Sequence, residues 1–188
     1  MDKTNFVLLI GIGLWFISRV RTRTWKQKNN KNGTLKLKKW ERLLIGAELF
    51  TIFIVWIQLY IYPVKCQVLA GLQIPGLILF FLGIFMALLA RHTLKENWHT
   101  ARDFAQPKRL VDSGIYRYIR HPIYFGSLLM GLGFELSIGS WLFFIVLVIG
   151  TPFIYKCSYK EEQLLKKWFG QEYLDYKKIT NWFFPGIF

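Results

Sequence analysis

The chain alternates long apolar stretches with short basic segments. A membrane-spanning helix needs roughly 20 apolar residues, with about 17 as the lower limit, so two of the stretches are long enough and three are short. The last two are separated only by Ser137–Ser140, which predicts a tight helical hairpin whose flanking turns lengthen both spans. The pattern predicts an all-α polytopic membrane protein with about five transmembrane helices. The stretches are Phe6–Ser18, Leu43–Tyr62, Leu72–Ala90, Ile123–Ile138 and Trp141–Tyr155.

Composition supports a membrane setting. Hydrophobic residues make up 53% and aromatic residues 18% of only 188 residues, which is more apolar surface than a soluble domain of this size can bury. We therefore interpret residues 1–188 as a single integral membrane domain, with three spans in residues 1–90 and the hairpin in residues 91–188.

The basic residues predict the topology. Residues 19–42 hold ten Lys or Arg and one acidic residue, residues 91–120 hold seven and three, and residues 156–188 hold six and four. The loop near residues 63–73 has only Lys65. The positive-inside rule places the three basic segments in the cytoplasm. We expect an N-terminus outside, a basic cytoplasmic loop at residues 19–42 with a flexible part at Lys26–Gly33, and a cytoplasmic C-terminus.

The formal net charge of +14 indicates membrane lipids as partners. Basic residues in short loops set topology and contact anionic headgroups, and no nucleic-acid motif accompanies them. We therefore expect no nucleic acid as a partner. The predicted topology places Cys66 and Cys157 on opposite faces, so we expect no disulfide within the chain and no metal site.

One motif lies where a helix should begin. Pro122 suits the first turn of a helix, because it lacks an N–H that would be unsatisfied there. His121 then lies at the helix start, where free N–H groups and the helix dipole favour an anion. A lone histidine here is more often structural. With Arg120, Tyr116 and Tyr124 beside it, a binding site is the better interpretation.

A second motif follows the last apolar stretch. From Tyr159 the pattern predicts an amphipathic helix on the membrane surface, with Gly170 as its stop. Its apolar face carries Leu164, Leu165, Trp168 and Phe169. This face leaves Glu161 and Glu162 unexplained, since acidic side chains near an anionic leaflet need a cation. Arg120, a lysine or a charged cofactor fits that need.

Together these motifs resemble the isoprenylcysteine carboxyl methyltransferase family over nearly all of residues 91–188. The matching motifs are Arg91-x-x-Leu94-x-x-x-Trp98, Leu110-Val111-x-x-Gly114-x-Tyr116-x-x-x-Arg120-His121-Pro122-x-Tyr124, Glu161-Glu162-x-x-Leu165-x-x-x-Phe169-Gly170-x-x-Tyr173-x-x-Tyr176, and Pro185. The resemblance implies an integral membrane methyltransferase that uses S-adenosylmethionine and a lipophilic acceptor, with a cofactor-binding half in residues 91–188 closed by a C-terminal helical lid.

The resemblance also implies site residues. Its cofactor contacts fall on Lys108, Arg109, Leu110, Val111, Tyr116, His121, Pro122, Ile123, Tyr124 and Glu161. His121 would meet the carboxylate of the cofactor, Glu161 its ammonium, and a tyrosine its adenine. Arg120 and Glu161 are the candidate catalytic residues.

Two departures leave the acceptor open. The family commonly has an arginine four residues before the paired glutamates, as a substrate-carboxylate contact, whereas this chain has Cys157 with Lys156 beside it. The glycine usual after Leu94 is Lys95. An isoprenylcysteine-type carboxylate, a lipid amine and a small isoprenoid acid all fit the remaining residues.

Two alternatives to a methyltransferase remain. Membrane sterol reductases carry a related Gly-x-Tyr…Arg-x-Pro-x-Tyr signature and use NADPH, but they usually have more spans and often have Asn at the position of His121. A non-catalytic lipid-binding membrane protein would explain the basic loops, but it leaves His121, Glu161 and Glu162 without a role.

Overall fold

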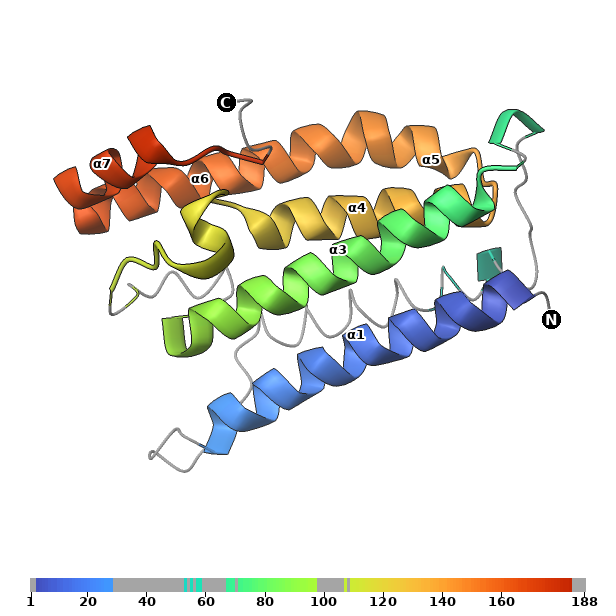
Figure 1. Cartoon of the computed structure of the whole chain (residues 1–188), viewed down its shortest axis with the longest axis horizontal. Coiled ribbons are helices and arrows are strands. Elements are labelled where there is room, and N and C mark those ends of the chain that lie inside the picture. Colours follow the sequence, from blue (N-terminus) through green and yellow to red (C-terminus); the bar gives the residue numbers. More distant parts are fainter. Residues whose placement is uncertain are drawn as a thin grey trace.

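The computed structural model describes residues 3–28, 53, 55, 57–58, 67–69, 71–97, 107 and 109–183. Within these residues the fold is all-α, with one isolated bridge between Ile119 and Asn181. The long helices α1, α3, α4 and α6 lie side by side, and α7 folds back along the end of α6 (Figure 1). Their bounds are α1 Lys3–Lys28, α3 Gln73–Leu94, α4 Pro122–Ser137, α5 Leu142–Ile145, α6 Thr151–Phe169 and α7 Gln171–Ile179.

Short elements connect these helices. A π-helical turn at Val146–Gly150 joins α5 to α6, so that residues 142–169 form one continuous helical run. The 3-10 helices are η1 Gln67–Leu69, η2 Lys95–Asn97 and η3 Gly114–Arg117.

Two apolar helices are long enough to cross a membrane, by length and composition: Gln73–Leu94 and Leu142–Phe169. The apolar helix Thr4–Ile17 is shorter. Leu8, Phe80, Ile84 and Phe134 form the core between α1, α3 and α4. Many large apolar side chains face outward instead, among them Ile78 and Phe85 of α3. Outward apolar side chains on long helices are what contact with lipid requires.

Glycines bring α3 and α4 unusually close together. Gly76 and Gly83 of α3 face Gly133 and Gly126 of α4, and we call these four residues the glycine seam. A Cβ atom placed on Gly83 would lie 2.5 Å from the carbonyl oxygen of Gly126, and one on Gly126 would lie 2.7 Å from that of Gly83. Small residues at the contact allow backbones to approach in this way in membrane proteins.

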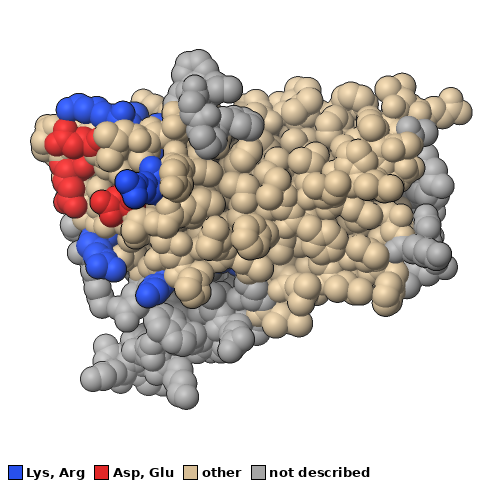
Figure 2. All heavy atoms as spheres, in the orientation of Figure 1, with Lys and Arg blue, Asp and Glu red and all other residues tan. Residues whose placement is uncertain are grey.

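Charged side chains of the described residues gather at one end of the bundle (Figure 2). The C-terminal ends of α1, α3 and α6, together with η3, the start of α4 and all of α7, lie at this end (Figure 1). We call it the charged end. Over the rest of the visible surface, the described residues are almost free of charge.

Two local predictions are wrong. Residues 19–28 were predicted as the start of a loop, but α1 continues to Lys28, because nothing in that segment breaks a helix. The amphipathic helix predicted from Tyr159 and its stop at Gly170, whose φ is +54°, are confirmed, but this helix continues α6 from Thr151 without a break and is not a separate helix on the membrane surface. The second apolar stretch lies largely outside the described residues, so the count of five spans stays a prediction.

Candidate functional site

The site is built around the start of α4. His121 is the N-cap residue of α4, and Pro122 occupies the first turn, which confirms the predicted helix start. The His121 carbonyl accepts a hydrogen bond from the Phe125 N–H at 3.0 Å. The side chain of His121 is only 2% exposed. It therefore belongs to the interior of the charged end and not to its surface.

Residues 180–183, which we call the C-terminal strap, pair with the chain just before α4. The Arg120 N–H donates to the Asn181 carbonyl at 2.8 Å, and the Asn181 N–H donates to the Tyr118 carbonyl at 3.1 Å. The strap then places Trp182 with its ring centroid 5.8 Å from that of His121. Trp182 is held in turn, because its indole N–H donates to Ser158 Oγ at 2.9 Å.

Glu162 lies at the centre of a buried charge network. Its Oε1 accepts from Arg120 Nε at 2.8 Å and lies 3.4 Å from His121 Nε2. Its Oε2 accepts from Lys177 Nζ at 2.6 Å. The Glu162 side chain is 1% exposed. Arg120 and Lys177 are therefore two of the cations that the paired glutamates were expected to need.

Arg120 also fastens α7 and the strap. Its Nη1 donates to the carbonyls of Lys177, at 3.1 Å, and Thr180. The Tyr176 hydroxyl of α7 donates to the Tyr116 carbonyl of η3 at 2.7 Å. Burial, followed by the negative charge of Glu162, raises the pKa of the nearby Tyr173 hydroxyl. This part of the site is tightly packed and holds η3, α6 and α7 together.

Glu161 lies on the other side of the His121 ring. Its Oε2 is 4.0 Å from His121 Nδ1, and its side chain is 38% exposed. Tyr116 and Tyr124 lie near the same carboxylate. Burial, followed by the charge of Glu161, raises the pKa of the Tyr116 hydroxyl well above its usual value. That hydroxyl keeps its proton at neutral pH and remains a hydrogen-bond donor.

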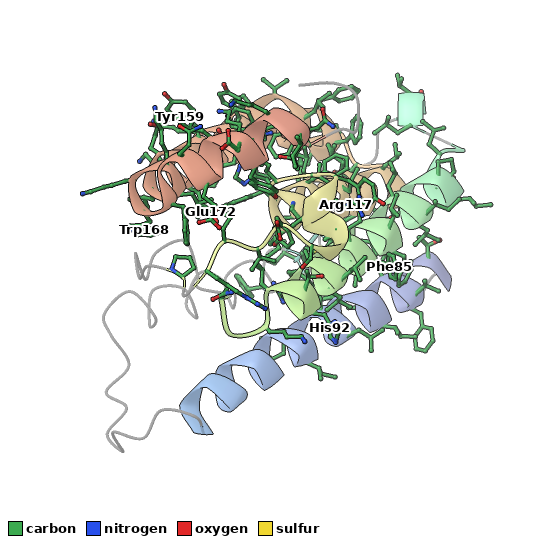
Figure 3. The ribbon with its side chains drawn as sticks, turned by 60° about the vertical axis from the view of Figure 1, so that its left-hand side comes forward. Phe85, His92, Arg117, Tyr159, Trp168 and Glu172 are labelled. Carbon is green, nitrogen blue, oxygen red and sulfur yellow. The ribbon has the colours of Figure 1, made fainter. Side chains whose placement is uncertain are left out.

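The remaining predicted residues differ in their burial. Arg109 is exposed, and Leu110 and Val111 are half-buried in the segment before η3. Ile123 and Cys157 are half-buried, Lys156 is exposed, and Lys108 lies outside the described residues. Figure 3 is turned so that the charged end comes forward. It shows Arg117 on η3, His92 in the last turn of α3, Tyr159 and Trp168 on α6, and Glu172 on α7.

Four site residues were missed by the sequence reasoning: Glu162 as the centre of the network, and Lys177, Thr180 and Trp182 as its surroundings. The paired glutamates gave a signal for Glu162. The other three come from the last described turns of the chain, and the order of residues along the chain does not indicate that they return to His121.

A model of the phospholipid methyltransferase family matches residues 72–172, which is more than half of the chain. The chain belongs to the phospholipid methyltransferase family. The match covers α3, η3, α4 and α6, and so includes His121, both glutamates and Arg120. Lys177 and the strap lie beyond it.

Individual relatives of the chain are also named as methyltransferases. The protein-S-isoprenylcysteine O-methyltransferase of Rattus norvegicus is 28% identical over 119 residues, which are 62% of this chain and 42% of the relative. That of Dictyostelium discoideum is 28% identical over 145 residues, covering 70% and 56%. A probable protein-S-isoprenylcysteine O-methyltransferase of Oryza sativa subsp. indica is 30% identical over 116 residues, which are 60% of this chain and 60% of the relative. The resemblance stated from the motifs is confirmed, although the chain spans less than two thirds of these relatives.

A solved structure has the same fold. It is a eukaryotic intramembrane Ras methyltransferase, an isoprenylcysteine carboxyl methyltransferase, and it matches with a TM-score of 0.68 at 21% identity. The match covers 100% of this chain and 69% of the other. The fold, the family and the two long apolar helices make this chain an integral membrane protein.

Proposed function

We propose that the protein is a membrane methyltransferase that transfers a methyl group from S-adenosylmethionine to a lipophilic acceptor. The observation that carries this proposal is the meeting of His121 with Glu161 and Glu162, 40 and 41 residues later in the chain, within a family described by methyl transfer. Among the described residues, no comparable feature favours a reductase or a non-catalytic lipid-binding protein.

The residues around His121 fit S-adenosylmethionine. This cofactor presents an ammonium, a carboxylate and a flat adenine, and it supplies an activated methyl group on a sulfonium. Glu161 offers a partly exposed carboxylate beside His121 Nδ1, which suits the ammonium. The hydroxyls of Tyr116 and Tyr124 lie near that carboxylate, and we assign the adenine to one of these tyrosines. The α4 N-terminus favours a carboxylate ligand. We assign the further contacts to Lys108, Arg109, Leu110, Val111, Pro122 and Ile123.

The chain's own part in the reaction is orientation and exclusion of water. Methyl transfer is a direct displacement and gains most from holding the reacting groups in line in a dry site. The strap and α7 bury the side chains around His121, which supports this role. Of the two candidate catalytic residues, Glu161 is the one that we assign to a ligand, because Arg120 is bonded to Glu162 and to the Lys177 and Thr180 carbonyls.

The acceptor is inferred from the relatives and from one departure. Relatives named for isoprenylcysteine suggest a carboxylate on a lipid-modified cysteine. A buried carboxylate needs a cation, and Cys157 supplies none. Since Arg120 is already paired with Glu162, the exposed Lys156 is the cation we assign to the acceptor.

Orientation in the membrane completes the proposal. We infer five spans, with the N-terminus outside and the charged end in the cytoplasm. The support is that the described parts of all three basic segments meet at one end of the bundle (Figure 1), as the positive-inside rule requires.

Equilibrium binding to purified protein in detergent tests the function. We expect radiolabelled S-adenosylmethionine to bind and NADPH not to compete. Glu161→Gln and His121→Ala should each weaken binding about ten- to a hundredfold, the cost of one charge-assisted hydrogen bond. Glu172→Gln removes an exposed carboxylate from α7 and should bind like wild type. The proposal would be refuted if NADPH bound to the protein and S-adenosylmethionine did not.

A further inference from the structure

We propose that Glu162 is a positioning residue: it fixes the His121 ring and the Arg120 guanidinium, and it makes no contact with a ligand itself. This inference rests on the proposed function, and it gives the two neighbouring glutamates different tasks. Glu161 faces the ligand, and Glu162 sets the geometry behind it.

The burial of the two side chains separates their tasks. The Glu162 side chain is 1% exposed and the Glu161 side chain is 38% exposed. Adjacent residues on an α-helix point about 100° apart. This step places the Glu162 carboxylate inside the packed network, beside His121 Nε2, and the Glu161 carboxylate beside His121 Nδ1. Glu161 is therefore the more accessible of the two carboxylates to a ligand.

The oxygens of Glu162 are already occupied by the protein. Oε1 accepts from Arg120 at 2.8 Å and lies against His121 Nε2, and Oε2 accepts from Lys177 at 2.6 Å. A carboxylate binds cationic donors of this kind strongly. A ligand ammonium at Glu162 would have to displace one of these groups and leave a buried charge unpaired, which is costly.

The contact with Glu162 also determines the chemistry of the His121 ring. A carboxylate only accepts, so Nε2 facing Glu162 must carry a proton. Which ring nitrogen carries the proton is set by the hydrogen bond that the other side of the ring makes. With Nε2–H directed at Glu162, it is Nδ1 that faces Glu161, at 4.0 Å. Glu162 thereby selects the nitrogen that His121 presents to a ligand.

Lys177 and Trp182 also hold the network in place. Lys177 Nζ lies 5.7 Å and Arg120 Cζ 5.9 Å from the centre of the Trp182 ring. Trp182 stacks on Tyr155 of α6, with 4.7 Å between ring centroids. Two cations, one carboxylate and stacked rings hold the strap against α6, and the strap in turn holds His121 in position.

The first test reads the His121 ring directly by nitrogen NMR of the full chain in detergent. The chain has three histidines, and His121→Asn identifies the signals of interest. We expect Nε2 of His121 to be protonated in wild type. In Glu162→Ala that preference should be lost, and Glu162→Gln, which keeps one accepting oxygen, should restore it in part. Asp175→Asn, which removes an exposed carboxylate from α7, should leave the spectrum unchanged.

The second test measures the affinity for S-adenosylhomocysteine in the same variants. We expect Glu162→Ala to weaken binding by about tenfold or more, with partial rescue in Glu162→Gln. An unprotonated Nε2 in wild type, a result that needs no folded variant, would overturn the inference. So would a Glu162→Ala protein whose ring signals and affinity match the Asp175→Asn control. If wild type binds no such ligand, the proposed function fails, while the ring signals still decide the role of Glu162.

Discussion

Alanine at Gly83 or Gly126 is expected to push α3 and α4 apart. A Cβ atom on Gly83 lies 2.5 Å from both the Gly126 carbonyl oxygen and the Met130 amide nitrogen, whereas ordinary contact begins at 3.4 Å. Both neighbours are backbone atoms that cannot rotate away. The helices must therefore separate locally by roughly 0.9 Å, which opens gaps around close-packed side chains.

The cost follows from two opposing terms. Overpacking a well-packed contact costs about 1–3 kcal/mol, and replacing glycine by alanine inside a helix returns about 0.5–1 kcal/mol. Because the clash is with backbone, we expect the upper part of the first range and a net loss of about 1–2 kcal/mol for Gly83→Ala. That is a factor of about 5–30 in the ratio of folded to unfolded protein.

Reversible unfolding in mixed detergent–SDS micelles, followed by circular dichroism, measures this loss. Gly131→Ala is the matched control, because it lies on α4 but its Cβ would meet only Val146 Cγ1, at 3.4 Å, and it should be neutral or slightly stabilising. The double variant Gly83→Ala/Gly126→Ala should lose less than the sum of the single losses, since one displacement relieves both clashes. Gly83→Ala unfolding at the same SDS fraction as Gly131→Ala would refute the seam's role.

Three further predictions concern the site and the topology. Tyr176→Phe removes the hydroxyl bond to the Tyr116 carbonyl and should lower the free energy of unfolding by about 0.5–1.5 kcal/mol in the same assay. Wild type should methylate farnesylcysteine analogues weakly, and Cys157→Arg should lower the KM for them; strong wild-type turnover would show that the missing arginine matters little. Single cysteines at the exposed positions Val68 and Lys178 should react with impermeant reagents from opposite faces of the membrane, and labelling from one face would contradict the topology.

The start of α4 was predictable because its signals are local. Proline can occupy the first turn of a helix. The polar residues before Pro122 mark the boundary with the apolar stretch that follows. The same holds for the end of α6 at Gly170, where φ is +54° and glycine has no steric penalty. Each of these boundaries depends on the conformational preference of one or two residues.

Residue chemistry alone could not divide Glu161 from Glu162, and only the family resemblance assigned the cofactor contact to Glu161. Both residues have the same chemistry, and only the rotation of α6 against α4 decides which one is buried. The position of the strap was even less predictable, because Asn181 pairs with Ile119 through a parallel bridge that no local sequence pattern indicates. Tertiary packing, and not propensity, brings Trp182 to His121.

The unbroken helical run from Leu142 to Phe169 ties the site to the bilayer. At 1.5 Å per residue, Glu162 lies roughly 30 Å along the axis from Leu142, which is about one hydrocarbon thickness. In a thinner bilayer such a helix tilts, and because Glu162 is bonded to Arg120, its far end then pulls on the start of α4 beside His121. The acyl-chain length of the surrounding lipid should therefore change the strain on the ion pair between Glu162 and Arg120, so that bilayer thickness reaches the site through α6.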